Sequence, residues 1–329
     1  MQERAWPRIA VVGAGAVGCY FGGMLARAGA PVTLIGRAPH VEAINRDGLF
    51  IDSIHFKESI SVSATNELGA VRDAQVVLFS VKTVDTENVA KLVAPYLAPE
   101  TLVVSLQNGV DNVERIDFAA GIQAIPAVVY IAAEMIGLGR VKHLGRGDLV
   151  IGTASSDHNA SEAEITEVAA TFTRAGIPCR VSKNITVELW EKLLMNCAYN
   201  AISALSRMKY GRIARDADSI EVMKHVIIEA VAVGKASGVQ LSSDTMVAAA
   251  LKLGSEAMPE ALSSTAQDIA RGKPTEIDSL NGFLVRRGAE MGVPTPVNQT
   301  LYSLVKLLEQ ASAASKVTAT APRPTQYSH

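Results

Sequence analysis

The chain has 329 residues, of which 48% are hydrophobic and 19% are charged, and its formal net charge is −2. This length allows two domains of ordinary size, and the near-neutral charge, without long lysine or arginine runs, argues against a nucleic-acid or anionic-membrane surface. No apolar run is long enough to span a bilayer, the N-terminus has no signal-peptide pattern, and the three cysteines lack metal-like spacing. We therefore expect a cytoplasmic globular protein without a bound metal.

Short β-rich runs alternate with helical runs through the first 182 residues. The predicted strands are residues 8–13, 31–36, 74–81, 101–109, 122–136, 139–145, 148–153 and 178–182. The predicted helices are residues 16–29, 83–97 and 160–175. Strands separated by crossovers of this length predict a parallel, doubly wound sheet, and we expect an antiparallel edge from the later strands.

Helical periodicity replaces the β pattern after about residue 183. The predicted helices of this part are residues 184–206, 220–237, 244–253, 277–291 and 300–311. The fold class is therefore an α/β domain at residues 1–182 followed by an all-α domain at residues 183–312. Residues 313–329 are poor in bulky apolar side chains and are expected to be disordered.

Gly13, Gly15 and Gly18 form a GxGxxG motif directly after a predicted strand and directly before a predicted helix. In a Rossmann-type nucleotide-binding domain these glycines allow a tight turn, backbone approach to a pyrophosphate and close helix–strand packing. The backbone N–H groups of Ala14, Ala16 and Val17 lie around the start of the predicted helix, where phosphates bind. The alternative is a glycine turn of purely structural use.

The end of the second strand indicates which nicotinamide cofactor is bound. An NAD site usually has an acidic residue there, but this chain has Arg37, whose guanidinium suits the 2′-phosphate of NADP(H). Arg37 is otherwise a solvated loop charge. Lys82 and Asn108 follow two further strand ends, where open α/β sheets bind ligands. Their alternatives are a surface lysine and a turn-forming asparagine.

Lys192, Asn196 and Asn200 recur every fourth residue in the apolar stretch "LWEKLLMNCAYNAIS". On a helix this spacing places one amine and two amides on one face, with a drift of about 40° per step. A solvent face and hydrogen bonding between helices are the two structural interpretations. The functional interpretation is a polar wall of an interdomain cleft, where the lysine protonates a carbonyl oxygen as hydride reaches carbon.

The segment "SSTAQDIARGKPTEIDSLNGFL" carries a candidate partner for this lysine. Thr275 and Asp278 resemble a capping box, which gives Glu276 a local role in the first helical turn. Alternatively, Glu276 holds the ammonium of Lys192 in place and keeps it charged. Ser264, beside Ser263, is a candidate ligand for a substrate carboxylate, although paired serines are common in loops and caps.

These motifs together resemble the ketopantoate reductase (2-dehydropantoate 2-reductase) family. "VVGAGAVGCYFGGMLARAG", "LIGR", "SVKT" and "SLQNGVDN" are similar to its nucleotide domain, and the Lys-x-x-x-Asn-x-x-x-Asn helix and the TEID segment are similar to its helical domain. The resemblance covers nearly the whole chain except the tail. It implies NADPH-dependent reduction of 2-dehydropantoate to (R)-pantoate, on the route to pantothenate and coenzyme A.

The resemblance also implies roles for individual residues. Lys192 would be the general acid, and Glu276 would position it or the nascent hydroxyl. The residues implied to hold substrate are Asn108, Asn196, Asn200 and Ser264. Those implied to lie at the cofactor are Gly13, Ala14, Gly15, Ala16, Val17, Gly18, Arg37, Lys82 and Asn108.

One position departs from the family pattern, because Tyr210 stands where some members have a further substrate-binding asparagine. The phenol would still offer one hydrogen bond to substrate, but it leaves the identity of the 2-oxo acid open. The alternative enzyme is an NAD(P)-dependent D-2-hydroxy-acid dehydrogenase, which acts on another branched or aromatic 2-oxo acid. A β-hydroxyacid dehydrogenase fits Arg37 and the TEID segment less well, and a non-catalytic nucleotide sensor needs no proton donor. The sequence leaves the oligomeric state open, with a homodimer among the options.

Overall fold

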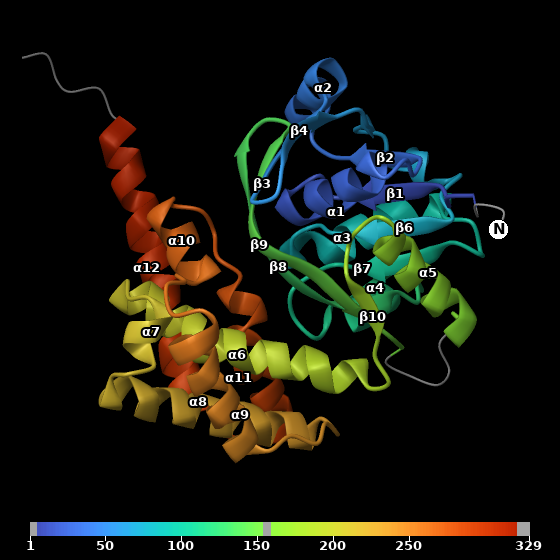
Figure 1. Cartoon of the computed structure of the whole chain (residues 1–329). Helices are drawn as coiled ribbons and strands as arrows, with labels where there is room; N and C mark the ends of the chain where they lie inside the picture. Colours follow the sequence, from blue (N-terminus) through green and yellow to red (C-terminus); the bar gives the residue numbers. More distant parts are fainter. Residues whose placement is uncertain (1–4, 154–158, 321–329) are drawn as a thin grey trace, which may run out of the picture. The chain divides into compact units, whose positions relative to one another are not determined.

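The computed structural model describes residues 5–153 and 159–320 (Figure 1). The chain divides into two compact units, Met1–Leu189 and Trp190–His329, which are described separately. The division falls inside helix α6 (Ile185–Ser206), a few residues beyond the boundary expected at residue 182. None of the helices in the described ranges has the length and apolar character needed to cross a membrane.

The first unit alternates strands with helices. Its elements, in chain order, are β1 (Ile9–Val12), α1 (Ala16–Arg27), β2 (Val32–Ile35), α2 (Ala38–Asp47), β3 (Leu49–Ser53), β4 (Lys57–Ile60), β5 (Ser63–Thr65), η1 (Leu68–Val71), β6 (Val76–Phe79), η2 (Thr83–Asp85), α3 (Thr86–Val93), η3 (Ala94–Tyr96), β7 (Leu102–Ser105), α4 (Asn112–Ala120), β8 (Ile125–Gly137), β9 (Arg140–Ile151), α5 (Glu162–Arg174) and β10 (Cys179–Val181).

The strands of the first unit form one mixed sheet in the order β4-β3-β9-β8-β7-β6-β1-β2-β5, with β10 paired to β9. Strands β5, β2, β1, β6, β7 and β8 are parallel neighbours, which is the doubly wound order of a Rossmann-type domain. The chain order reverses between β1 and β6, and ligands of such sheets bind where this happens. The predicted α/β class is therefore confirmed.

Two details of the predicted sheet were wrong. Strand β9 is continuous where the sequence suggested two strands, and its antiparallel pairing with β8 lies inside the sheet rather than at its edge. Strands β3, β4 and β5, which have three to five residues each, were not predicted from the sequence. The predicted strands β1, β2, β6 and β7 are equally short, but they are almost entirely apolar, whereas β3, β4 and β5 contain polar residues and have no continuous apolar run.

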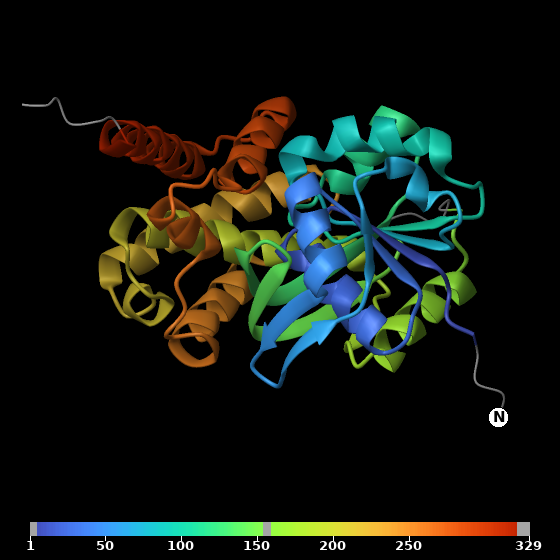
Figure 2. The same cartoon turned by 90° about the horizontal axis from the view of Figure 1, so that it is seen from above.

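Helices cover both faces of the parallel strands. As a result, all four residues of β1 are buried, and they alternate between two cores. Ile9 and Val11 pack in the core that contains apolar residues of α1 and α5. Ala10 and Val12 pack in the core that contains apolar residues of α3 and α4. Figure 2 shows the teal helices α3 and α4 on one side of the strands and the yellow-green helix α5 on the other. This packing fixes the strand ends that carry the glycine motif.

The second unit is helical in all its described elements. These are the remainder of α6, then α7 (Tyr210–Ile213), α8 (Ala217–Ala236), α9 (Ser243–Lys252), the π-helical turn η4 (Leu253–Ala257), α10 (Ser264–Ala270), η5 (Ile277–Ser279), α11 (Asn281–Met291) and α12 (Pro296–Thr320). Trp190 and Phe283 meet edge to face at 5.9 Å between ring centroids. Helix α12 continues to Thr320, into the segment expected to be disordered, and residues 321–329 lie outside the described residues.

Candidate functional site

The glycine motif forms the turn between β1 and α1, beside the end of β6. Gly13 has a φ of +111°, a conformation that favours glycine, and a β-carbon there would lie 2.8 Å from backbone atoms of Ser80. The hydroxyl of Ser80 donates to the carbonyl oxygen of Gly13 at 2.9 Å. The turn is therefore packed against β6 at the point where the strand order reverses.

The other two glycines of the motif differ in what surrounds them. A β-carbon at Gly18 would lie 2.2 Å from the carbonyl oxygen of Gly13, so α1 approaches the turn too closely for any side chain. A β-carbon at Gly15 would meet nothing within 4 Å, so the space in front of this residue is open. The first turn of α1, which starts at Ala16 and Val17, has backbone N–H groups without acceptors inside the helix. An open face, free N–H groups and a positive helix end together fit a dinucleotide pyrophosphate.

Arg37 follows the end of β2, which contacts the glycine turn. The backbone N–H groups of Gly13 and Ala14 both donate to the carbonyl oxygen of Ile35 at 3.0 Å. A β-carbon at Gly36 would lie 2.6 Å from that of Ala14, so the two loops are in contact. Arg37 follows directly, is exposed, and starts α2 without capping it through its side chain. Arg37 is thus an exposed cation one residue beyond a loop that contacts the glycine turn.

The loops after β6 and β7 are joined at the backbone of Asn108. The carbonyl oxygen of Asn108 accepts hydrogen bonds from the Thr83 hydroxyl at 3.3 Å and from the Asn112 side-chain amide at 2.7 Å. Lys82, directly before Thr83, is exposed and precedes the short helix η2. Gly109, directly after Asn108, has a φ of +106°, a conformation that favours glycine. The two loop residues predicted from sequence are therefore brought close together.

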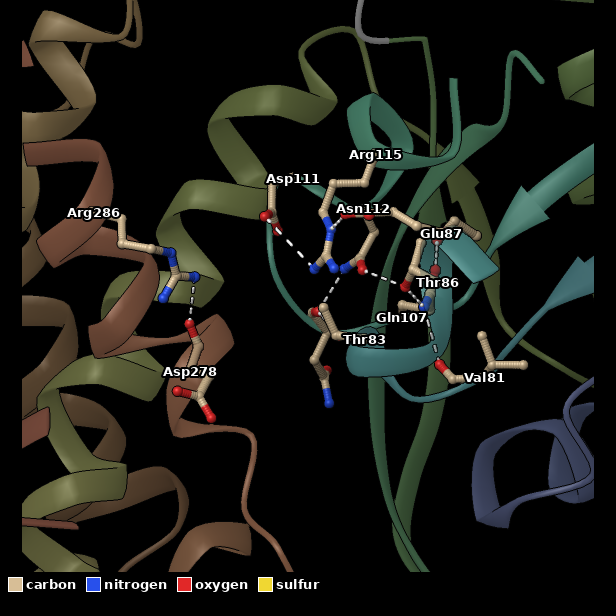
Figure 3. A network of polar contacts seen from close by, with 12 residues as sticks. Val81, Thr83, Thr86, Glu87, Gln107, Asp111, Asn112, Arg115, Asp278 and Arg286 are labelled. Atoms are coloured by element: carbon tan, nitrogen blue, oxygen red, sulfur yellow. Dashed lines mark hydrogen bonds and ion pairs between the residues drawn. The ribbon is translucent and has the colours of Figure 1, made fainter. Parts of the chain in front are cut away.

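Gln107 holds these loops in place and was not identified from the sequence. Its side chain is buried, and its amide nitrogen donates to the Val81 carbonyl oxygen at 3.0 Å and to the Thr86 hydroxyl at 2.7 Å. Its amide oxygen accepts from the Ser105 hydroxyl at 3.0 Å. The Thr86 hydroxyl in turn donates to the side-chain oxygen of Asn112 at 3.3 Å, so the contacts form a continuous network (Figure 3). Buried amides with several partners fix a loop firmly, since each lost bond leaves an unsatisfied group.

In the second unit, the polar stripe of α6 differs in exposure along its length. Lys192 and Asn196 are half-buried, whereas Asn200 is only 3% exposed. The Tyr210 hydroxyl donates to the side-chain oxygen of Asn200 at 3.3 Å, and the Ser263 hydroxyl donates to its backbone carbonyl oxygen at 3.2 Å. The interpretation of the stripe as a solvent face therefore fails for Asn200, whose amide is held by other parts of the same unit.

Tyr210 is part of a buried aromatic pair. Its ring stacks on that of Tyr199, with 4.2 Å between centroids and an interplanar angle of 23°. Burial, with a smaller contribution from Tyr199, raises the pKa of Tyr210 above its usual value. The Tyr199 hydroxyl donates to the Ala250 carbonyl oxygen at 2.7 Å. The Tyr210 phenol is therefore a neutral donor directed at Asn200.

The Glu276 region differs from the predicted capping box. Glu276 is half-buried and precedes η5, a three-residue 3₁₀ turn, with no side-chain cap. The Thr275 hydroxyl accepts from the N–H of Ile277 at 3.2 Å, while the Asp278 carboxylate binds α12 instead of closing a box. This prediction was wrong because α12 supplies stronger partners for Asp278 than the local backbone does.

The two serines before this region have separate positions. Ser263 is buried and caps α10, since its hydroxyl accepts from the Ala266 N–H at 3.0 Å. Ser264, the residue predicted to bind a carboxylate, is exposed at the first position of α10. A cap role therefore applies to the first serine, and the second remains available to a ligand.

Known protein families match both parts of the chain. The family models Ketopantoate reductase PanE/ApbA and Ketopantoate reductase PanE/ApbA C terminal match residues 9–156 and 184–309. A 2-dehydropantoate 2-reductase of Pyrococcus horikoshii is 33% identical over 309 residues, which cover 94% of this chain and 100% of the relative. A corresponding protein of Caulobacter vibrioides is 32% identical over 301 residues, covering 90% and 97%.

Solved structures show the same similarity. A PanE/ApbA family ketopantoate reductase from Ralstonia eutropha JMP134 has a TM-score of 0.84 at 47% sequence identity, and the match covers 93% of this chain and 99% of that one. The ternary structure of a D-mandelate dehydrogenase with NADH and anilino(oxo)acetate has a TM-score of 0.85 at 23% identity, over 93% and 99%, which shows a shared fold. The family models span most of the chain, and this protein therefore belongs to the ketopantoate reductase family.

Proposed function

We propose that this protein reduces the C2 carbonyl of 2-dehydropantoate to give (R)-pantoate, with NADPH as the reductant, on the cytoplasmic route to pantothenate and coenzyme A. The observation that carries the proposal is the match of both family models to a chain that keeps Lys192, Asn196 and Asn200 on one uninterrupted helix. The relatives named 2-dehydropantoate 2-reductase support the same reaction. The three free cysteines are compatible with a reducing compartment.

The cofactor would be held by the first unit. Gly13, Gly15 and the first turn of α1 fit the pyrophosphate, as the open space at Gly15 supports. Arg37 would bind the 2′-phosphate, and Lys82 and Asn108 would lie at the cofactor on the neighbouring loops. When bound, the reduced nicotinamide supplies a hydride.

The choice of cofactor gives a direct test of Arg37. Replacing Arg37 with alanine should raise the KM for NADPH by about 10-fold or more, because a charge-assisted hydrogen bond contributes about 1.5–3 kcal/mol. The KM for NADH, which has no 2′-phosphate, should change little and serves as the internal control. Steady-state rates with both cofactors measure this selectivity, and equal weakening of the two would contradict the assignment.

Lys192 would act as the general acid at the substrate carbonyl. As hydride reaches C2, negative charge develops on the carbonyl oxygen, and the ammonium stabilises this charge and then transfers a proton to it. The product hydroxyl carries that proton, and Lys192 recovers one from solvent before the next turnover. Glu276 would keep the ammonium oriented and charged.

The remaining polar residues would hold the substrate. Asn196 would bind substrate hydroxyl or carbonyl groups, Asn108 would lie near the reacting end, and Ser264 would bind the carboxylate. The buried contact between Tyr210 and Asn200 supports an indirect part for the phenol, which would orient the Asn200 amide toward substrate. Tyr210 would then influence which acid is accepted through Asn200.

A substrate screen tests the proposed reaction. Mixing the protein with NADPH and ketopantoate should remove the near-ultraviolet absorbance of the reduced cofactor, and the same mixture without the acid is the control. The panel should include branched and aromatic 2-oxo acids, because Tyr210 departs from the family pattern and a D-2-hydroxy-acid dehydrogenase is the competing function. Turnover of another acid without turnover of ketopantoate would replace the substrate while keeping the reaction type.

A further inference from the structure

Glu276 is held in a segment with little structure of its own. In residues 275–279, the Ser279 N–H donates to the Glu276 carbonyl oxygen at 2.9 Å, and the Ile277 N–H donates to the Thr275 hydroxyl. A 3₁₀ turn of three residues has too few hydrogen bonds to persist by itself. Ile277 is completely buried and fixes the middle of the segment. The residues on either side of Glu276 therefore need partners from elsewhere.

Helix α12 supplies these partners on both sides of Glu276. The N–H of Thr275 donates to the carboxylate of Glu309 at 2.7 Å. The carboxylate of Asp278 accepts from the Tyr302 hydroxyl at 2.7 Å and from the Lys306 ammonium at 2.8 Å. Because Lys306 also lies 2.9 Å from Glu309, one lysine connects the two attachment points.

The geometry of α12 makes this arrangement specific. Tyr302, Lys306 and Glu309 are spaced by four and three residues, so they share one face of the helix. Arg286 of α11 adds a bond of 2.8 Å to the carbonyl oxygen of Asp278, which Figure 3 shows. Two helices thus hold the backbone and the side chain of the same aspartate.

The charges of this cluster support one another. The pKa of Lys306 is raised, first by its hydrogen bond to Asp278 and also by Glu309, against the opposing effect of burial. Burial alone would raise the pKa of Asp278, but hydrogen bonds from Lys306 and Tyr302 outweigh it and leave the pKa below its usual value. The Lys306 and Asp278 side chains are 35% and 38% exposed, and exposed ion pairs contribute little to global stability. The cluster is therefore better suited to positioning a segment than to stabilising the unit.

We propose that Tyr302, Lys306 and Glu309 are positioning residues for the reductase reaction, which fix the Glu276 segment (residues 275–279) so that the Glu276 carboxylate stays oriented toward catalysis. The proposal rests on the proposed catalytic role of Glu276. It assigns to a helix near the C-terminal end of the chain a part in turnover, without direct contact to substrate.

The experiment compares Lys306→Met with a matched control. Lys306→Met should lower kcat by about 10-fold with little change in the KM for NADPH, since a displacement of about 1 Å at a catalytic group costs up to about 100-fold. Lys306→Arg should restore most of the rate, because it keeps the charge. The control is Lys224→Met on α8. Lys224 pairs with Glu221 three residues away, as Lys306 pairs with Glu309, and its loss should leave kcat unchanged.

Hydrogen exchange gives a readout that does not depend on activity. In Lys306→Met and Glu309→Gln, amides of residues 275–279 should exchange faster, while amides of α8 should keep their protection. Unchanged exchange in residues 275–279 would overturn the proposal, because the segment would then be held without α12. Loss of protection throughout the second unit would also overturn it, because the cluster would then be structural.

A double-mutant cycle separates this proposal from the proposed role of Glu276. In a Glu276→Gln background, Lys306→Met should change kcat less than about 2-fold, because the group that it positions is already altered. A full 10-fold loss in that background would overturn the positioning role alone. If Glu276→Gln by itself leaves kcat unchanged with the preferred 2-oxo acid, the proposed catalytic role of Glu276 fails first, and the positioning role fails with it.

Discussion

Replacing Lys192 with alanine is expected to lower kcat by about 10²–10⁴-fold, the usual contribution of a positioned general acid. Without the ammonium, the negative charge that develops on the carbonyl oxygen has no proton donor at this position. Cofactor affinity should stay within about 2-fold, since all proposed cofactor residues lie in the first unit. Loss of near-ultraviolet NADPH absorbance measures the rate, and cofactor fluorescence measures binding.

The control for Lys192→Ala is Lys224→Ala, which removes a lysine from the surface of α8. It should retain the full rate. An unchanged kcat in Lys192→Ala would remove this lysine from the chemistry. If Lys192→Ala weakened only cofactor affinity, Lys192 would instead have a role in cofactor binding.

The second large effect is expected at the glycine turn, where two similar substitutions should act differently. Gly18→Ala should lower the free energy of unfolding by about 1–3 kcal/mol, because the new methyl group overlaps the carbonyl oxygen of Gly13 and forces α1 to move. Gly15→Ala should leave stability unchanged or slightly higher, since its methyl group enters open space. That space is where we expect the pyrophosphate, so the KM for NADPH should rise by about 10-fold or more, at about 1.4 kcal/mol per factor of ten.

Denaturant unfolding without cofactor and steady-state kinetics distinguish the two glycine variants. The contrast between the variants is informative. Gly15→Ala should raise the KM for NADPH without lowering the free energy of unfolding, whereas Gly18→Ala should change both quantities. Normal cofactor binding by Gly15→Ala would show that the pyrophosphate does not bind at this face of the turn.

Local features of the chain could be predicted from its sequence. The glycine motif is contiguous with the strand and helix that it joins, so its role in the turn follows from neighbouring residues. The spacing of Lys192, Asn196 and Asn200 predicted one helix face, and α6 contains all three. The division into an α/β part and a helical part likewise follows from the change in hydrophobic period.

Only the tertiary structure decided which distant polar groups meet. Gln107 bonds to Thr86, 21 residues away, and its burial has no local signature in "SLQNG". Asp278 binds α12 rather than the cap that its spacing from Thr275 suggested. A polar side chain takes the partners that the packed chain brings within reach, and hydrophobic periodicity does not specify them.

Tyr210 and Asn200 show the same limit within the proposed site. The sequence identified both as polar residues of interest, but it could not show that one donates to the other in a buried position. That contact depends on how the chain after α6 folds back against it, through the stacking of Tyr210 on Tyr199. The sequence by itself therefore determined which chemical groups α6 carries, and the fold decided that the last of them is held by a phenol, because burial leaves each polar group only the partners packed around it.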